Sequence, residues 1–417
     1  MNDPAATTLH LVDTSTGQYR ALNAGAAEAA VDAEWLADGR LASVIHVGVQ
    51  SLLRIYNADG SVAEEHDPGE LILTSVQAGG NRLAVTANAP RHPSELFVWN
   101  PSSNGGSFER WTNHNDWLSE ITFGEQRAYT YTANDGQQVE GVLILPVGGV
   151  PRGGAPTIMN VHGGPEAHDS NGWQTAYSKP GHVAAGQGYA VFLPNYRGST
   201  GYGVAFSKQH QGNYTDPEFR DIVDAKYALA ADGITDPERT GITGGSYGGY
   251  ASAWGATYHS DEYAASVMFV GISDQISKFG TTDIPYEMYN VHSRAWPWDN
   301  WQKMLEVSPI YYTDRARTPL LIMHGEEDTR VDPSQSMELY RFIKVRQPDT
   351  PLRLVFYPGE GHGNSRAASR YDYNLRMMRW FDTYLKTGDR DAELPPARPQ
   401  LAEGAKGATA PEDDSED

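Results

Sequence analysis

The sequence contains no cysteine. This absence excludes disulfides, thiolate metal sites and a cysteine nucleophile together. The sequence also has no apolar run long enough to span a bilayer, so no membrane partner is expected. Its first residues, Met1 to Pro4, lack the basic and apolar regions of a signal peptide. We therefore expect a cytoplasmic protein.

Positive charge is scarce. The 417 residues include 32 Lys and Arg against 53 Asp and Glu, which gives a formal net charge of −21 and argues against nucleic acid as a partner. There is no H-E-x-x-H pattern and no Gly-rich phosphate loop with a lysine after a strand, so we expect neither a metal nor a cofactor. Part of the acidic excess lies in the last six residues, and residues 395–417 are expected to form a disordered acidic tail.

Residues 1–115 show short β-type runs separated by glycine turns, without a helical period. Gly39–Ala42 followed by Leu53–Tyr56 resembles Asn81–Ala84 followed by Leu96–Trp99, roughly forty residues later, which is the period of a propeller blade. The region is therefore predicted to be a partial β-propeller of about two blades, truncated relative to a closed ring. A small β-sandwich is the alternative. Exposed strand surfaces of an incomplete propeller predict self-association into a homo-oligomer.

Residues 116–394 have a different pattern, in which apolar strands alternate with helices after a hairpin at Asn134-Asp135-Gly136. This alternation predicts a mostly parallel, doubly wound sheet of the α/β-hydrolase type, preceded by the partial β-propeller. The expected strands are 157–161, 190–193, 266–270, 320–323 and 352–357, and the longer expected helices are 217–231 and 371–386.

The stretch Gly244-Gly245-Ser246-Tyr247-Gly248 is a G-x-S-x-G pattern between an apolar run and an Ala-rich segment. In such a sharp turn from strand to helix, the serine backbone is strained and its hydroxyl stands clear of the sheet. Ser246 is therefore the candidate nucleophile. A Gly-rich turn that happens to contain a serine is the structural alternative.

A partner for Ser246 is expected in a loop after a later strand, because chemistry collects at the carboxyl ends of parallel strands. Asp328 follows the strand 320–323, and His362 follows the strand 352–357. The order serine, acid, histidine is that of an α/β-hydrolase. His362 would accept the Ser246 proton, and an ionised Asp328 would orient the imidazole.

Other residues in the Asp328 loop compete for these roles. Glu326, Glu327 and Asp332 are alternative acids that spacing alone does not separate from Asp328. His324 is a weaker candidate for the base because it sits at a strand end in the same loop as the acid.

An acyl-transfer site also needs hydrogen-bond donors for the oxyanion. The backbone N–H of Tyr247, directly after the nucleophile, is one expected donor. The second is expected from the loop Asn160–Pro165, where two glycines allow the backbone to approach a substrate.

Five motifs together resemble the prolyl oligopeptidase family of serine peptidases, in particular its acylaminoacyl-peptidase and dipeptidyl aminopeptidase branch. The resemblance runs from about Ser119 to Lys386. The motifs are His162-Gly163-Gly164-Pro165, the stretch Asn195 to Gly203, the Ser246 heptad, the Asp328 loop and Gly361-His362-Gly363.

This resemblance implies an α/β-hydrolase domain and a propeller that restricts entry to short peptides. It assigns the triad to Ser246, Asp328 and His362, and the oxyanion N–H groups to Tyr247 and Gly164. It also implies that Arg330 binds a substrate carbonyl and, with Val331, belongs to the substrate-binding loop. A local carboxylate is the alternative partner of Arg330. Some branches carry an oxyanion tyrosine where this sequence has His162, so backbone donors are expected here.

The sequence thus predicts a serine peptidase that hydrolyses short peptides, as an aminopeptidase or oligopeptidase, through an acyl-enzyme. A carboxylesterase uses the same triad on the same fold and is the alternative enzyme. An inactive fragment or binding scaffold is the alternative outside enzymes.

Overall fold

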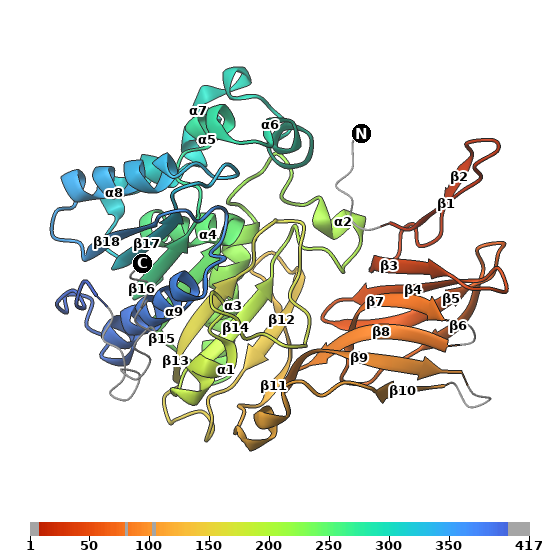
Figure 1. Cartoon of the computed structure of the whole chain (residues 1–417). Helices are drawn as coiled ribbons and strands as arrows, with labels where there is room; N and C mark the ends of the chain where they lie inside the picture. The colour runs from red at the N-terminus through yellow and green to blue at the C-terminus, as the bar shows by residue number, and fades with distance from the viewer. Residues whose placement is uncertain (1–7, 80–81, 102–105, 399–417) are drawn as a thin grey trace, which may run out of the picture.

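The computed structural model describes residues 8–79, 82–101 and 106–398. Two parts lie side by side in Figure 1: a large α/β part, and a smaller part made of antiparallel sheets from the first third of the chain. Most of the acidic tail expected at 395–417 lies outside the described residues. Among the described helices, none has the length and apolar character needed to cross a membrane.

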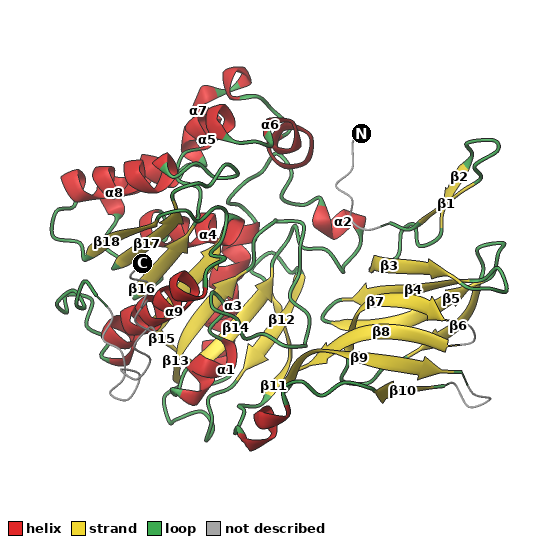
Figure 2. Cartoon of the chain, viewed as in Figure 1, coloured by secondary structure: helices red, strands yellow, loops and turns green. Residues whose placement is uncertain are grey.

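The α/β part is built on one eight-stranded sheet, shown in yellow in Figure 2, with the order β11-β12-β14-β13-β15-β16-β17-β18. The six strands from β14 to β18 in this order run parallel, and β11 and β12 form an antiparallel hairpin at one edge. The strands are β11 (Gln126–Thr132), β12 (Gln138–Ile144), β13 (Ala155–Val161), β14 (Ala190–Asn195), β15 (Thr235–Gly245), β16 (Ala265–Phe269), β17 (Leu320–Gly325) and β18 (Leu352–Tyr357).

Helices cover both faces of this sheet, which explains why its central strands are apolar without alternation. Every residue of β13, β14, β16 and β17 is buried. α3 and α4 pack on one face with α8, while α1 and α9 pack on the other. The α-helices are α1 (Gly181–Gly186), α2 (Val204–Ser207), α3 (Glu218–Ala231), α4 (Tyr247–Thr257), α5 (Gln275–Thr281), α6 (Pro285–Glu287), α7 (Trp301–Glu306), α8 (Ser334–Arg346) and α9 (Ala367–Phe381).

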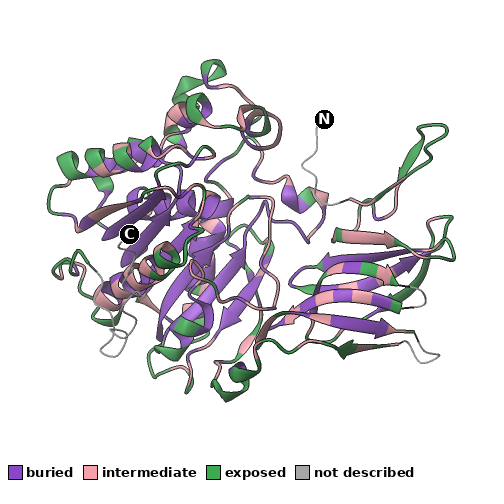
Figure 3. Cartoon of the chain, viewed as in Figure 1, coloured by how far each residue is buried: buried purple, intermediate pink, exposed green. Residues whose placement is uncertain are grey.

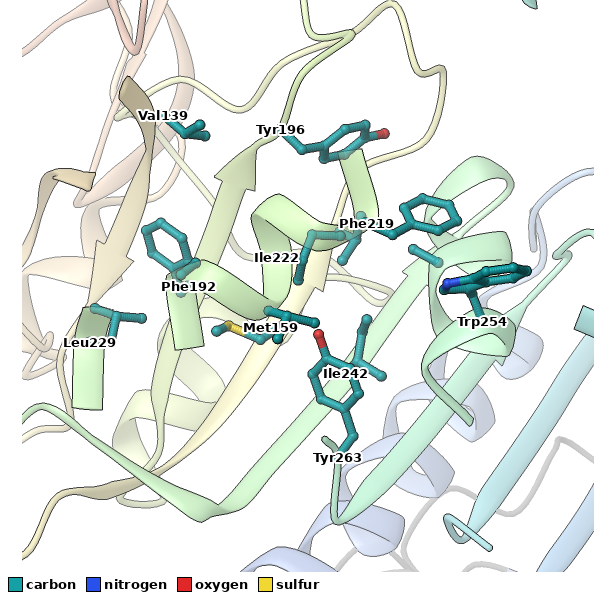
Figure 4. Packing of buried hydrophobic residues seen from close by; sticks show 14 of the residues in the cluster. Val139, Met159, Phe192, Tyr196, Phe219, Ile222, Leu229, Ile242, Trp254 and Tyr263 are labelled. Carbon is teal, nitrogen blue, oxygen red and sulfur yellow. The ribbon is translucent and has the colours of Figure 1, made fainter. Parts of the chain in front are cut away.

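The largest core cluster lies between the sheet and helices α3 and α4. Figure 4 shows part of it, where Met159 and Ile242 from the sheet meet Phe219, Ile222 and Trp254 from the helices. Figure 3 shows the same region as a continuous buried layer. This packing fixes the strand ends from which the site loops emerge. Short helical turns are found at η1 (Asp116–Glu120), η2 (Met288–Ser293), η3 (Pro297–Asp299), η4 (Pro309–Arg315) and η5 (Asp382–Lys386).

The smaller part consists of two four-stranded antiparallel sheets and a short hairpin. The repeat read from the sequence falls on equivalent strands, because its first copy lies on β4 and β5 and its second on β8 and β9, the middle pair of each sheet. The expected fold class, an α/β-hydrolase-type sheet preceded by a partial propeller, is confirmed. The strands are β1 (His10–Val12), β2 (Tyr19–Ala21), β3 (Ala29–Trp35), β4 (Leu41–Val47), β5 (Gln50–Tyr56), β6 (Val62–His66), β7 (Ile72–Gly79), β8 (Arg82–Ala89), β9 (His92–Asn100) and β10 (Ser107–Arg110).

The small sheets contact the loops at the carboxyl end of the large sheet. The Gly48 N–H donates to the carbonyl of Gly201 at 2.9 Å, and the Asn171 N–H donates to the carbonyl of Val49 at 2.7 Å. The turn between β4 and β5 is therefore tied to two loops of the α/β part.

Candidate active site

Ser246 occupies the turn between β15 and α4, with φ 59° and ψ −117°. A positive φ is strained for a residue with a Cβ, and the geometry is that of a nucleophile elbow. The neighbouring glycines let this turn pack against the end of β13, because a Cβ on Gly244 or Gly248 would lie 2.3 or 2.0 Å from the carbonyl oxygen of Val161. The Ser246 N–H donates to the carbonyl of Phe269 at 3.0 Å, which holds the turn to β16.

His362 and Asp328 come from the loops after β18 and β17. His362 Nδ1 donates to Asp328 Oδ2 at 2.7 Å, while Asp328 Oδ1 accepts from the backbone N–H groups of Arg330 and Val331 at 2.9 and 3.0 Å. With its proton on Nδ1, the His362 ring presents Nε2 as a free acceptor. The carboxylate is thus fixed by its own loop and orients the imidazole.

His324 lies behind this pair and is fully buried. Its Nε2 lies 2.8 Å from the carbonyl oxygen of Val331 and 3.2 Å from Asp328 Oδ2, and its Nδ1 lies 2.6 Å from Ser336 Oγ. Burial acts to raise the pKa of Asp328, but hydrogen bonds from His324 and His362 outweigh it and hold that pKa below its usual range. Asp328 is therefore ionised at neutral pH, and His324 acts as its support.

The other acids of the loop point elsewhere. Glu326 and Glu327 are exposed, and Asp332 accepts the N–H of Ser334 at 2.9 Å just before α8 begins. Asp328 alone among the four is buried and contacts His362. The tertiary structure therefore separates candidates that the spacing left open.

Ser246 and His362 line one cavity of about 690 Å³, within the size range of small-molecule and side-chain binding sites. The other residues expected at the site that line it are Gly164, Tyr247, Arg330 and Val331. The structure thus gathers the β15–α4 turn and the loops after β13, β17 and β18 around one cavity, and Asp328 acts on this cavity through His362.

The loop after β13 approaches Ser246 closely. A Cβ on Gly163 would lie 3.2 Å from Ser246 Cβ, and Gly164 has φ 120°, a conformation that favours glycine. His162 stacks on Tyr196 with ring centroids 4.4 Å apart, and the Tyr196 hydroxyl donates to the His162 carbonyl at 2.9 Å. This support holds the loop backbone beside the serine, and a second oxyanion donor from Gly164 stays a prediction.

Tyr247 is the first residue of α4, so its N–H is one of the free donors at a helix N-terminus. Its side chain points away from solvent and donates to Glu218 Oε1 at 2.9 Å. The Tyr247 backbone is therefore anchored on a buried carboxyl group.

Arg330 does line the cavity, but its guanidinium is already paired. Arg330 Nε donates to Asp283 Oδ1 at 2.7 Å, and both side chains are 43 % exposed. The local carboxylate considered from the sequence is therefore present. A role for Arg330 in binding a substrate carbonyl stays a prediction.

Sequence reasoning did not single out Glu166, which directly follows the His162–Pro165 motif and lines the cavity. Glu166 lies 3.2 Å from His210 Nε2 and 3.4 Å from His292 Nε2. Burial acts to raise the pKa of Glu166, yet contacts with the two histidines lower it to about 2. The only sequence signal was its position next to a recognised motif.

Glu218 was also missed, because nothing in a helix start announces a buried acid. It is fully buried at the first turn of α3 and accepts the Thr215 N–H at 2.5 Å as well as the Tyr247 hydroxyl. Burial raises the pKa of Glu218 to about 7. In the part of the chain that the structure describes, no group of three or more His, Asp or Glu side chains is arranged to hold a metal ion.

Comparison with known proteins places this geometry in a family. The model of the prolyl oligopeptidase family matches residues 175–388. The uncharacterized peptidase YuxL of Bacillus subtilis (strain 168) is 33 % identical over 316 residues, covering 75 % of this chain and 47 % of YuxL. The acylamino-acid-releasing enzyme of Rattus norvegicus is 30 % identical over 254 residues, covering 59 % of this chain and 34 % of that enzyme.

A solved structure of an acylaminoacyl peptidase in complex with Z-Gly-Gly-Phe-chloromethyl ketone is also similar. It superposes with a TM-score of 0.79 at 25 % identity and covers 91 % of this chain and 59 % of that one. The present chain spans less than half the length of the two curated relatives named above. The family match over half of the chain, together with the shared fold, shows that the chain belongs to the prolyl oligopeptidase family of serine peptidases.

Proposed function

We propose that this chain hydrolyses peptide bonds of short peptides through an acyl-enzyme formed on Ser246. One observation carries the proposal. The strained Ser246 and His362 line the same cavity, and His362 is oriented because its Nδ1 donates to Asp328. Peptides are favoured as substrates because the similar acylaminoacyl peptidase was solved with a peptidyl chloromethyl ketone.

In the first half of the reaction, His362 Nε2 accepts the Ser246 proton while Ser246 Oγ attacks the substrate carbonyl carbon. The resulting oxyanion accepts hydrogen bonds from the N–H groups of Tyr247 and Gly164. The protonated imidazole is stabilised by Asp328 and returns its proton to the leaving amine as the C–N bond breaks. An ester links the acyl group to Ser246 at this stage.

Water completes the cycle. His362 removes one proton from a water molecule as its oxygen attacks the ester carbonyl, and that proton returns to Ser246 Oγ when the acid product leaves. The same residues serve acylation and deacylation, because in each of them His362 first accepts a proton from the nucleophile and then donates it to the leaving group. The chemistry needs no group beyond the triad and the oxyanion donors.

The test compares hydrolysis of an aminoacyl 4-nitroanilide with that of a simple acyl ester. A peptidase should turn over the anilide with useful efficiency, while a carboxylesterase should turn over only the ester. Ser246→Ala should lower kcat for the anilide by several orders of magnitude. Ser252→Ala, the same change one turn and a half further along α4 and outside the cavity lining, should leave it within a few-fold.

Loss of activity only in the Ser252 variant, or retained activity in Ser246→Ala, would contradict the proposal. Anilide and ester rates that are both indistinguishable from buffer alone would favour the inactive scaffold considered from the sequence. Self-association through the small sheets stays a separate prediction, which size-exclusion chromatography with light scattering checks.

A further inference from the structure

Lys278 lies on α5 and lines the same cavity as Ser246. Its side chain is only 4 % exposed. Lysine is almost never buried to this degree unless its charge is paired. The contacts of this ammonium group therefore decide whether its charge is paired.

The partners that the protein supplies are weak. Lys278 Nζ donates to the carbonyl oxygen of Arg330 at 3.4 Å, which is long for such a hydrogen bond, and lies 3.4 Å from Met288 Sδ, which is only a weak acceptor. Within residues 8–79, 82–101 and 106–398 it forms no ion pair with a carboxylate. An ammonium has three donors, so at least one remains available to a ligand in the cavity.

Burial and the neighbouring charges act on the Lys278 ammonium in opposite directions. Burial lowers the pKa of Lys278 to about 8, and the charge of Arg330 acts in the same direction, while the carboxylates of Asp328, Asp283 and Glu287 oppose the shift without contacting the ammonium. A charge held in this way is under-solvated. It gains most from an anion that enters the cavity.

The other charges that line the cavity do not supply such an anion. Glu166 is held between two histidines, His210 and His292. Glu287 is exposed on α6, and the guanidinium of Arg330 is paired with Asp283. Among the described lining residues, Lys278 is therefore the buried charged side chain that forms no ion pair.

We infer that the cavity binds the carboxylate side chain of an aspartate or glutamate residue of the substrate, with Lys278 as the specificity-determining residue. The inference rests on the proposed function for the placement of the substrate. Ser246 lines the cavity, so under the proposed function the cavity receives the side chain of the residue that contributes the scissile carbonyl. A free C-terminal carboxylate on that residue would stand where the scissile bond must be, which favours the side chain as the source of the anion.

Binding tests this inference independently of hydrolysis. In the Ser246→Ala background, titration calorimetry compares N-acetyl-Ala-Glu-amide with its isostere N-acetyl-Ala-Gln-amide, and both with uncapped N-acetyl-Ala-Gln. The Glu amide should bind about tenfold or more tightly than the Gln amide, since a hydrogen bond between charged groups contributes about 1.5–3 kcal/mol. Adding Lys278→Met should remove this ratio, Lys278→Arg should retain most of it, and Lys303→Met, the same change on the exposed surface of α7, should leave it unaltered.

Equal binding of the Glu and Gln amides would overturn the inference, whether or not the Lys278 variants fold. A Lys278-dependent preference for the uncapped acid over the Glu amide would also overturn it, because the terminal carboxylate would then be the ligand. A Glu preference in a chain that hydrolyses no anilide would support the subsite and reject the peptidase, so the two failures are distinguishable.

Discussion

Replacing Asp328 with asparagine leaves the base His362 in place but changes which of its ring nitrogens carries the proton. Asp328 receives two backbone N–H groups on Oδ1 and the two imidazoles of His324 and His362 on Oδ2. In Asp328→Asn the amide oxygen can keep the backbone pair, and the amide nitrogen then faces both rings. An amide N–H donates and cannot accept, so His362 must turn its lone pair to Nδ1 and carry its proton on Nε2.

A proton on Nε2 blocks the transfer from Ser246. We therefore expect kcat for an anilide substrate to fall by about 10³–10⁴-fold, which corresponds to about 4–5.5 kcal/mol of transition-state stabilisation. The variant should also be less stable by about 1–3 kcal/mol, because the amide N–H and the His324 ring N–H now face each other. Denaturant unfolding measures this loss of stability, and kcat is compared under conditions in which both proteins are folded.

Two matched variants complete the assay. Asp332→Asn and Glu327→Gln make the same carboxylate-to-amide change within the same loop, at residues that do not contact His362, and each should retain kcat within a few-fold. The reasoning is refuted if Asp328→Asn keeps kcat within tenfold of the parent while remaining folded. It is equally refuted if either control loses more activity than Asp328→Asn.

Three further predictions concern the frame around the site. Gly248→Ala should destabilise the fold by about 1–3 kcal/mol, since its Cβ would lie 2.0 Å from the last carbonyl oxygen of β13; Gly280→Ala, with open space around it, is the control, and equal denaturation midpoints would contradict the packing argument. Glu218 binds a proton more tightly in the folded state, where its pKa is about 7, so the free energy of unfolding should fall by about 3 kcal/mol as pH rises from about 4.5 to 7. Glu218→Gln should abolish that part of the pH dependence of stability in urea titrations. His168 Nε2 lies 2.7 Å from His46 Nδ1 where the small sheets meet the site loops, and burial, with the charge of His46, lowers the pKa of His168 to about 3. The folded state therefore binds fewer protons, and the free energy of unfolding should fall by about 2 kcal/mol as pH decreases from 6.5 toward 4.5. His168→Gln should lose less stability over this pH range, and an unchanged pH dependence would refute His168 as its origin.

Much of the architecture could be predicted from the sequence, because the relevant signals are local. The apolar runs at 190–193 and 320–323 became β14 and β17, since burial on both faces demands continuous hydrophobic residues. The helix expected at 217–231 is α3, which begins one residue later at Glu218. The forty-residue repeat fell on matching strands of two sheets for the same reason: each sheet forms from neighbouring segments.

Local chemistry also picked out Ser246 and His362. Glycines on both sides of the serine indicate a backbone that only a tight turn requires, and the Ser246 φ of 59° agrees with that interpretation. The order of the loops along the chain pointed to His362, because parallel strands bring their carboxyl ends to one edge of the sheet.

The identity of the acid that contacts His362 depends on the packing of distant segments. Glu326, Glu327, Asp328 and Asp332 lie within seven residues of one another. Their side chains differ in burial and direction, and these depend on where β17 ends relative to β18 rather than on residue type. The contact at 2.7 Å between Asp328 and His362 joins residues 34 positions apart.

The burial and pairing of the charged residues that line the cavity could likewise not be predicted from the sequence. Lys278, Glu166 and Arg330 are ordinary surface residue types, and no local pattern shows that Lys278 is buried while Arg330 pairs with Asp283. Desolvation and charge pairing are sums over neighbours from distant segments, here α5, the loop after β13 and the loop after β17. Residue identity along the chain fixes which groups can react, whereas the packing of these segments fixes which charges remain free to bind a substrate.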